Sequence, residues 1–254
     1  MPSIIPIPAF ADNYIWALRE GEHVAVVDPG DAVPVIAYLE RENLALSAIL
    51  ATHHHGDHVG GIHALTARWK VPVYGPARED IPGRTRACAA GDAIVVPGPG
   101  IEFAVLDIPG HTAGHIAFVG GGSVFCGDTL FAAGCGRLFE GTPAQMLASL
   151  DTLAALPDAT QVYCGHEYTL SNLRFARAVE PGSEPLAERE KRVQAKRAQG
   201  LPTLPSMISE ERLTNPFLRV REPAVRAAIE RHAGRTLDSA VAAFAELRAW
   251  KNSF

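Results

Sequence analysis

Four histidines and one aspartate fall within six consecutive positions of this sequence, in the segment Thr52-His53-His54-His55-Gly56-Asp57-His58. Each imidazole carries two polar nitrogens that need partners, so packing alone does not explain such a cluster. Metal coordination would satisfy these nitrogens, because zinc and related cations prefer neutral imidazole and ionised carboxylate ligands. The segment therefore predicts a metal site.

The spacing within the segment predicts that the ligands divide between two metals. Residues 48–51 are apolar and, with Thr52, indicate a buried strand, and side chains alternate in direction if the chain stays extended beyond it. His53 and His55 then face the same way and would hold one metal. His54 faces the other way, so we expect it to be exposed or to support the site without binding metal.

A second pair of ligands follows the turn that Gly56 allows without steric cost. Asp57 and His58 come directly after this glycine and can point to a nearby second position. We therefore expect Asp57 and His58 to hold the second metal.

Three later segments share one form, in which an apolar strand ends in a glycine followed by a metal-type residue: His111, Asp128 and His166. Strand ends at one edge of a sheet converge, and binding sites form there. Because a carboxylate can bridge two cations, we expect Asp128 to join both sets, with a hydroxide as a further bridge. The predicted ligands are His53, His55, His111 and Asp128 for one metal, and Asp57, His58, His166 and Asp128 for the other.

Several other polar residues have simpler explanations. We expect His115 to be structural or to support the site, and Asp28 to support a turn or loop. The four cysteines are scattered without a CxxC pair, so we expect free, reduced thiols. The two metals are expected to be divalent zinc ions, although iron and manganese also suit histidine and aspartate ligands.

The composition excludes several classes of function. The chain has 254 residues, 47% of them hydrophobic, and a net charge of −5, which gives no electrostatic footprint for nucleic acid. No apolar run approaches the roughly 20 residues that span a bilayer. The N-terminal segment lacks a basic region and contains prolines, so we expect no signal peptide and a cytoplasmic location. We also expect a monomer.

The pattern of elements changes near residue 167. Before it, short β-branched runs alternate with helical segments at 33–43, 58–70 and 143–156, the last with Thr142 as its N-cap. After it, we expect no strand and four helices, at 170–179, 184–199, 223–232 and 237–250, the last capped by Thr236. The sequence therefore predicts an α/β domain over residues 1–166 and a small all-helical domain over residues 167–254.

These motifs resemble known families. The order T-H-x-H-x-D-H, then His, Asp and His, resembles the metallo-β-lactamase superfamily. That resemblance implies a four-layered αβ/βα sandwich with a dinuclear metal site at one edge. Four more stretches, at 10–16, 134–142, 165–169 and 248–254, resemble the glyoxalase II (hydroxyacylglutathione hydrolase) family in particular.

The resemblance also implies a glutathione-binding site, with contacts from Arg137, Tyr168, Arg248 and Lys251. Glutathione is a net anion, and a protein of net charge −5 must supply local cations to bind it. Arg137 stands where other members carry Lys, which keeps the charge, and Phe139 stands where others carry Tyr, which removes a hydroxyl.

The activity implied is hydrolysis of S-D-lactoylglutathione, an S-(2-hydroxyacyl)glutathione, to D-lactate and glutathione, the second step of methylglyoxal detoxification. We expect a bridging hydroxide to attack the thioester carbonyl, with Asp57 orienting it. The alternatives are a glutathione persulfide dioxygenase of the same superfamily with a single iron, and a non-catalytic protein with structural metals. The dinuclear ligand set and the R-x-x-K ending favour the hydrolase, and structural zinc sites are usually rich in Cys.

Overall fold

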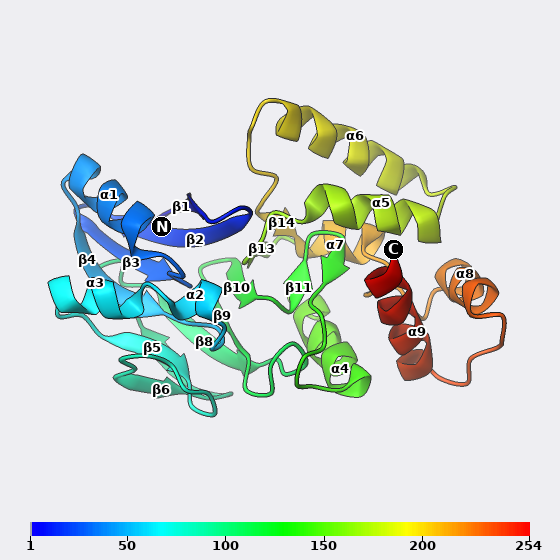
Figure 1. Cartoon of the computed structure of the whole chain (residues 1–254), viewed down its shortest axis with the longest axis horizontal. Coiled ribbons are helices and arrows are strands. Elements are labelled where there is room, and N and C mark those ends of the chain that lie inside the picture. Colours follow the sequence, from blue (N-terminus) through cyan, green and yellow to red (C-terminus); the bar gives the residue numbers. More distant parts are fainter. Residues whose placement is uncertain (1) are drawn as a thin grey trace.

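Two six-stranded β-sheets lie face to face in the computed structural model, which describes residues 2–254 (Figure 1). In the first sheet, β1, β2 and β3 are antiparallel neighbours, and β3 to β6 run parallel. Its strands, in spatial order, are β1 (Ser3–Ala9), β2 (Asn13–Glu20), β3 (His23–Val27), β4 (Ala45–Leu50), β5 (Val73–Pro76) and β6 (Arg86–Cys88).

In the second sheet, β13 and β10 are parallel and every other neighbouring pair is antiparallel. Its strands, in spatial order, are β14 (Ser206–Met207), β13 (Gln161–Cys164), β10 (Ser123–Gly127), β9 (Ile116–Gly120), β8 (Glu102–Asp107) and β7 (Ala93–Val95). A separate small hairpin consists of β11 (Leu130–Phe131) and β12 (Gly134–Cys135).

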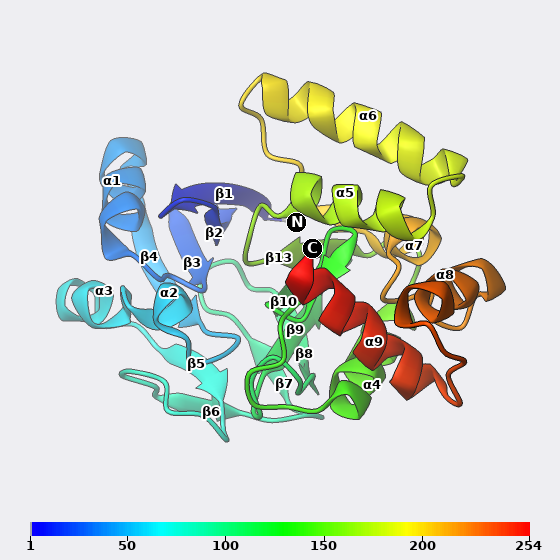
Figure 2. The same cartoon turned by 45° about the vertical axis from the view of Figure 1, so that its right-hand side comes forward.

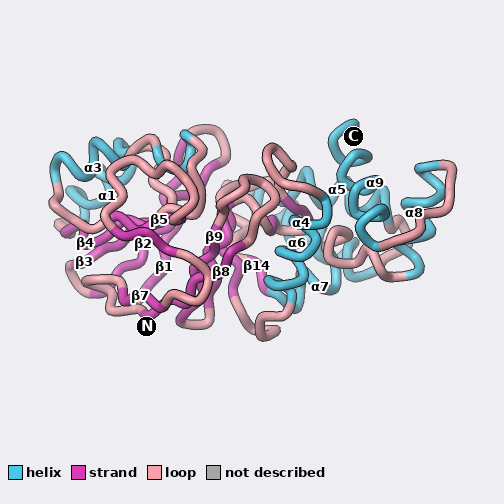
Figure 3. Tube along the Cα trace, turned by 90° about the horizontal axis from the view of Figure 1, so that it is seen from below, coloured by secondary structure: helices cyan, strands magenta, loops and turns pink. Residues whose placement is uncertain are grey.

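Side chains that alternate between the two faces of a strand contribute to two different layers of the core. In β3, Val24 and Val26 pack with helices α1 (Ala32–Glu42) and α3 (Ile62–Arg68), whereas the intervening Ala25 joins the core between the sheets. Figure 3 shows α1 and α3 together on one side of the first sheet. The other outer layer begins with α4 (Pro143–Ala154), whose buried face belongs to the core shared with the second sheet. The expected four-layered sandwich is confirmed.

Five helices follow the last long strand: α5 (Thr169–Val179), α6 (Glu184–Ala198), α7 (Ile208–Thr214), α8 (Pro223–Ala233) and α9 (Ala240–Ser253). In Figure 2 they lie beside the second sheet, away from α1 and α3. Phe175 of α5, Phe244 of α9 and Phe217, in the turn between α7 and α8, belong to the same buried cluster as the core between the sheets. None of the helices in residues 2–254 has the length and apolar character that crossing a bilayer requires.

The helix expected over 58–70 is two helices, α2 (Gly56–Val59) and α3. The chain between them packs against the loop after β3, and a Cβ at Gly61 would lie 2.6 Å from the Pro29 carbonyl oxygen. This close approach of two backbones sets the break.

Other differences lie in short elements. The expectation of no strand after residue 167 is wrong, because β14 pairs with β13 and forms an edge of the second sheet. Helix α7 was not predicted, and neither was the hairpin of β1 and β2. Thr142 caps α4 as expected, through a capping box with Gln145. Thr236 is not a cap, because α9 begins later and Ser239 accepts a hydrogen bond from the Ala242 N–H instead.

Candidate active site

Four strand ends deliver the predicted metal-type residues to one edge of the sandwich. The His cluster follows β4, and His111, Asp128 and His166 follow β8, β10 and β13. The glycines before the last two are required by close contacts: a Cβ at Gly127 would lie 2.2 Å from Thr52 Oγ1, and one at Gly165 would lie 2.5 Å from His58 Cε1.

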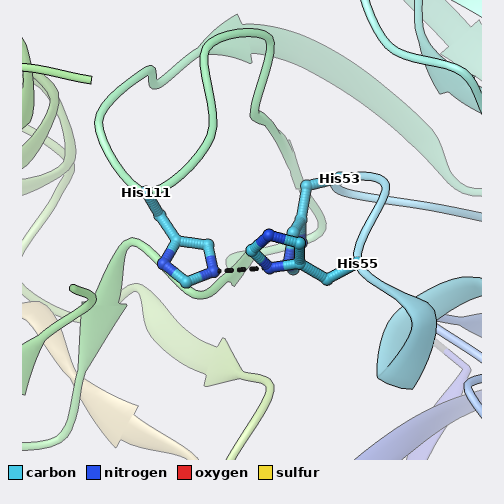
Figure 4. Close-up of side chains that lie close together, drawn as sticks. All are labelled: His53, His55 and His111. Atoms are coloured by element: carbon cyan, nitrogen blue, oxygen red, sulfur yellow. Dashed lines mark hydrogen bonds between the residues drawn. The ribbon is translucent and has the colours of Figure 1, made fainter. Parts of the chain in front are cut away.

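His53, His55 and His111 form the first group (Figure 4). His111 Nε2 lies 2.9 Å from His55 Nδ1, and the His53 ring centre lies 4.8 Å from that of His55 and 5.1 Å from that of His111. Figure 4 shows His111 approaching from a different loop than the other two. The structure thus brings together the three imidazoles predicted for one metal.

Asp57, His58 and His166 form the second group. His58 Nε2 lies 3.4 Å from His166 Nε2. Asp57 Oδ2 lies 3.4 Å from His166 Nε2 and 3.7 Å from His58 Nε2. All three side chains therefore direct ligand atoms to one point.

Asp128 lies between the two groups. Its Oδ2 is 3.5 Å from His111 Nε2 in the first group and 3.3 Å from His166 Nε2 in the second. Its Oδ1 is 3.4 Å from His58 Nε2. This carboxylate is placed where it can contact ions held by either group.

The outer nitrogens of the second group bind carboxylates. His58 Nδ1 donates to Asp28 Oδ2 at 3.0 Å, and His166 Nδ1 donates to Asp12 Oδ1 at 2.8 Å. With the proton held on Nδ1, the Nε2 lone pair faces inward, which is the tautomer that metal binding requires.

The first group is oriented by a backbone carbonyl and a hydroxyl. His111 Nδ1 donates to the Arg137 carbonyl oxygen at 2.9 Å. Thr52 Oγ1 donates to Asp28 Oδ2 at 2.7 Å and lies 3.0 Å from His53 Nδ1, so it accepts from that nitrogen. Asp28, expected only to support a loop, therefore orients one histidine from each group.

Charges within the cluster are strongly coupled. Burial favours a neutral Asp128, but His58 and His166 outweigh it and hold the pKa of Asp128 well below its usual value. Burial, and then the neighbouring His58 and His115, lower the pKa of His53 well below its usual value. His53 is therefore neutral and Asp128 ionised at neutral pH, the states in which both bind cations.

The donor set fits divalent cations. His53 Nε2 and Asp128 Oδ1 are buried and have no hydrogen-bond partner among the described residues. Such orphaned atoms are costly unless something binds them. A cation in each group would satisfy both, whereas packing or hydrogen bonding within the described residues does not.

His54 and His115 lie outside both groups, as expected. The His54 ring lies between Glu79 and Glu140. His115 is buried, stacks on His53 with ring centres 4.5 Å apart, and accepts from the Asp128 N–H at 3.2 Å. Both therefore support the cluster without joining it.

A cavity of about 610 Å³ opens from this cluster toward the C-terminal helices. It is lined by both kinds of predicted site residue. The metal-type residues in its wall are His55, Asp57, His111, Asp128 and His166, and the residues expected to bind glutathione are Arg137, Tyr168, Arg248 and Lys251.

The two C-terminal cations differ in their surroundings. Arg248 is buried, donates to the Cys135 carbonyl oxygen at 2.8 Å and lies over the Phe217 ring at 5.0 Å. Lys251 Nζ lies 3.3 Å from the Ser171 carbonyl oxygen. Burial and then the positive charges nearby, Arg248 first, lower the pKa of Lys251 to about 8.

Two aromatic residues flank the metal-type cluster. Tyr168 stacks on His166 with ring centres 4.7 Å apart, and burial together with nearby carboxylates raises the pKa of its phenol, which stays protonated. Phe139 packs edge-on against His55 and His111 and is 63% exposed. Phe139 thus places an apolar ring beside the cluster, at the position where other members of the family that the sequence resembles carry the hydroxyl of a tyrosine.

The chain matches two family models and a series of full-length relatives. The model described as hydroxyacylglutathione hydrolase C-terminus matches residues 167–254, and that of the metallo-beta-lactamase superfamily matches residues 10–87 and 90–166. The chain is 58% identical over 266 aligned residues to the hydroxyacylglutathione hydrolase of Cupriavidus taiwanensis, and the match covers 100% of both. The chain belongs to the hydroxyacylglutathione hydrolase family.

Solved structures agree on the fold of this hydrolase family. TTHA1623, whose crystal structure is in a di-iron-bound form, is 32% identical with a TM-score of 0.53, and the match covers 65% of this chain and 91% of that one. ETHE1 from Myxococcus xanthus has a TM-score of 0.66 over 100% of this chain and 99% of that chain. At 23% identity, that likeness concerns the fold alone.

Two residues that orient the second group were missed by the sequence reasoning. Asp12 contacts His166, and Asn13 Nδ2 donates to Asp57 Oδ2 at 3.0 Å. Both lie where β1 turns into β2, in one of the stretches that resemble the family. That resemblance was the available signal, because nothing local predicts that this turn reaches a site more than 40 residues away.

Proposed function

We propose that this chain hydrolyses the thioester bond of S-(2-hydroxyacyl)glutathione, with S-D-lactoylglutathione as substrate and D-lactate and glutathione as products. One observation carries the proposal: the cluster of metal-type residues forms one part of a cavity whose other walls carry cations. Membership of the hydroxyacylglutathione hydrolase family supports the proposal. The reaction would be the second step of methylglyoxal detoxification.

The proposal includes two divalent metal ions per chain, with zinc expected and iron or manganese suited as well. His53, His55, His111 and Asp128 would hold one ion, and Asp57, His58, His166 and Asp128 the other. The di-iron form of TTHA1623 supports a pair of ions on this fold. When bound, such ions polarise a carbonyl oxygen and lower the pKa of water toward about 7.

Asp57 is proposed to orient the attacking water in addition to its place in the second group. Its Oδ2 accepts from the Asn13 side chain at 3.0 Å, which restrains the carboxylate. Asp57 also lines the cavity, so a water bound to it would lie beside the substrate. A fixed acceptor beside the reacting carbonyl favours a productive line of attack.

The leaving group needs little assistance. A thiol has a pKa of about 8.5, so glutathione can depart as a thiolate without a strong general acid. The cysteines are poorly suited as nucleophiles, since burial raises the pKa of Cys126 to about 12 and raises that of Cys164 well above its usual value. We therefore propose direct hydrolysis without an acyl-enzyme.

Glutathione binding is assigned to Arg137, Tyr168, Arg248 and Lys251. Among the described residues, no carboxylate forms a salt bridge within 4.0 Å of Arg137, Arg248 or Lys251. Their positive charge is therefore available to an anionic substrate. The proposed division is a catalytic domain over residues 1–166 and a substrate-binding domain over residues 167–254, and the family-model matches support this boundary.

Two further expectations are a monomeric enzyme and a cytoplasmic location. Sedimentation analysis of the purified protein tests the first, with a single species of 27.1 kDa expected. Fractionation of the source cells tests the second.

The decisive experiment is metal analysis of the purified protein together with hydrolysis of S-D-lactoylglutathione. About two metal equivalents and release of free thiol are expected. Oxygen uptake with glutathione persulfide is the control arm for the dioxygenase alternative. Full activity with one metal, or oxygen uptake without thioester hydrolysis, would overturn the proposal.

A further inference from the structure

The His54 side chain joins three loops that meet at the first metal group. Its Nδ1 lies 3.0 Å from Glu79 Oε2, and its Nε2 lies 3.2 Å from Glu140 Oε1. His54 stands between His53 and His55 in the chain, whereas the two glutamates come from separate segments. Both ring nitrogens therefore face carboxylates beside the first group.

The two glutamates in turn hold the loop that carries His111. Glu140 Oε2 accepts from the Ala113 N–H at 2.8 Å. Glu79 Oε1 accepts from the Gly114 N–H at 2.9 Å and also from the Thr112 hydroxyl. One carboxylate oxygen of each glutamate thus faces His54 and the other binds residues 112–114.

Glu140 also belongs to the loop that carries Arg137 and Phe139. The Phe139 N–H donates to the His111 carbonyl oxygen at 3.2 Å, and His111 Nδ1 donates to the Arg137 carbonyl oxygen at 2.9 Å. Residues 137–140 therefore contact the His111 loop through both backbone and side chain. Their position and that of His111 are linked.

We propose that His54 is a positioning residue that, through Glu79 and Glu140, sets the distance between His55 and His111 and places the Arg137 loop against them. The inference rests on the proposed function, because it concerns the metal and substrate groups of that same site. Its effect should be selective: the link touches the loops of the first group, whereas Asp57, His58 and His166 are oriented by Asn13, Asp28 and Asp12.

Loss of the link should weaken one metal site. Groups that orient metal ligands through hydrogen bonds typically contribute about 10–100-fold in metal affinity. We expect His54→Ala to lower the metal affinity of the first group by about 10–100-fold and to leave the metal affinity of the second group near its normal value. The KM for lactoylglutathione should rise as well, because the Arg137 loop is no longer held.

The test measures metal release from the full-length protein as the concentration of a chelator is raised. The proteins compared are the unmodified chain, His54→Ala, Glu140→Ala and the double variant. His63→Ala is the matched control, since His63 is an exposed histidine on the neighbouring helix α3. Amide hydrogen exchange of Ala113 and Gly114 reports directly on the two carboxylates. His54→Gln, which keeps hydrogen-bonding capacity, should recover part of the affinity.

Three results are expected for the single variants: one metal equivalent released at lower chelator concentration, faster amide exchange at Ala113 and Gly114, and a higher KM. The double variant should bind metal no more weakly than the more affected of the two single variants. Equal loss of both metals, unchanged metal release and exchange, or fully additive single variants would overturn the proposal. Metal release and amide exchange do not depend on the substrate. Failure of the proposed reaction is therefore distinguishable from failure of this inference.

Discussion

Asp128 is the residue on which the two ligand groups depend together. It is buried, its two oxygens lie within 3.5 Å of His58, His111 and His166, and one of those oxygens has no hydrogen-bond partner among the described residues. A carboxylate in this position can act as a metal ligand together with the imidazoles of either group. Replacing it removes a ligand from each, whereas replacing one histidine removes a ligand from one.

We therefore predict that Asp128→Ala loses both metals together and that His111→Ala mainly weakens the first. Metal content after dialysis, measured by atomic emission, distinguishes these results. An Asp128→Ala protein that retains two equivalents would contradict the shared position of this carboxylate.

Lys251 should make substrate binding depend on pH. Burial and the surrounding positive charges place its pKa at about 8, so the ammonium form is lost as pH rises through that value. A charge-assisted hydrogen bond is worth about 1.5–3 kcal/mol, so kcat/KM should fall by roughly tenfold between pH 7 and 9.5. Lys251→Arg stays charged over this range and should remove that part of the fall. Identical pH profiles for the two proteins would exclude this role.

The cysteines should be dispensable for chemistry. Cys126 and Cys164 are buried with raised pKa values, and the pKa of Cys135 is raised by burial even though Arg248 lies beside it. A triple Cys→Ala variant that folds and binds metal should keep a kcat within a few fold of normal. In labelled water, solvent oxygen should enter the lactate carboxylate in the first turnover. Isolation of an acyl-enzyme would rule out direct hydrolysis.

At the scale of elements, α6 and α7 hold the hairpin of β11 and β12 through a buried ion pair. Arg189 and Glu211 are 2% and 0% exposed, and Glu211 also accepts from the Ala133 N–H at 2.8 Å. Asn215 donates to the carbonyl oxygens of Phe131 and Gly134. This hairpin supplies Phe131 and Cys135 to the cavity wall.

Glu211→Ala should therefore cost about 3–5 kcal/mol, because it removes the buried carboxylate that pairs with Arg189 and leaves the guanidinium only the partly exposed Glu210, at 3.2 Å. The exposed pair of Arg221 and Asp151 is the control, and Arg221→Ala should cost no more than about 1 kcal/mol. Urea denaturation of both variants gives the comparison. A similar loss of unfolding free energy in the two variants would show that the buried pair contributes no more than the exposed one.

The same elements show what the sequence could predict. His111, Asp128 and His166 were predicted as ligands because each follows a glycine at the end of an apolar strand, and the structure brings them together. The turn carrying Asp12 was missed, since prolines at positions 6 and 8 hide the strand before it. β14 has two residues, too few for any alternation to show. Contacts that depend on tertiary packing leave no local pattern.

At the scale of the whole molecule, the proposed domains share one core. The buried cluster between the sheets continues through α4 into Phe217 and Phe244 of the helical part. The Trp16 indole of β2 donates to the Cys164 carbonyl oxygen at 2.9 Å, which ties the two sheets together beside the cavity. Arg248 and Lys251 on α9, which are proposed to bind substrate, are therefore fixed relative to the metal-type residues by packing and not by a flexible linker.

This shared core predicts that the two proposed domains unfold together. Separating residues 167–254 from the sandwich would expose large apolar side chains, each worth about 1.5–3 kcal/mol when fully buried. The metal-loaded protein should therefore show one calorimetric transition, with equal calorimetric and van't Hoff enthalpies. Leu247, 0% exposed on α9, is a suitable probe, and Leu247→Ala should shift that single transition downward without splitting it. Two separated transitions, or a variant in which only a minor transition moves, would show that the helical part is an independent unit.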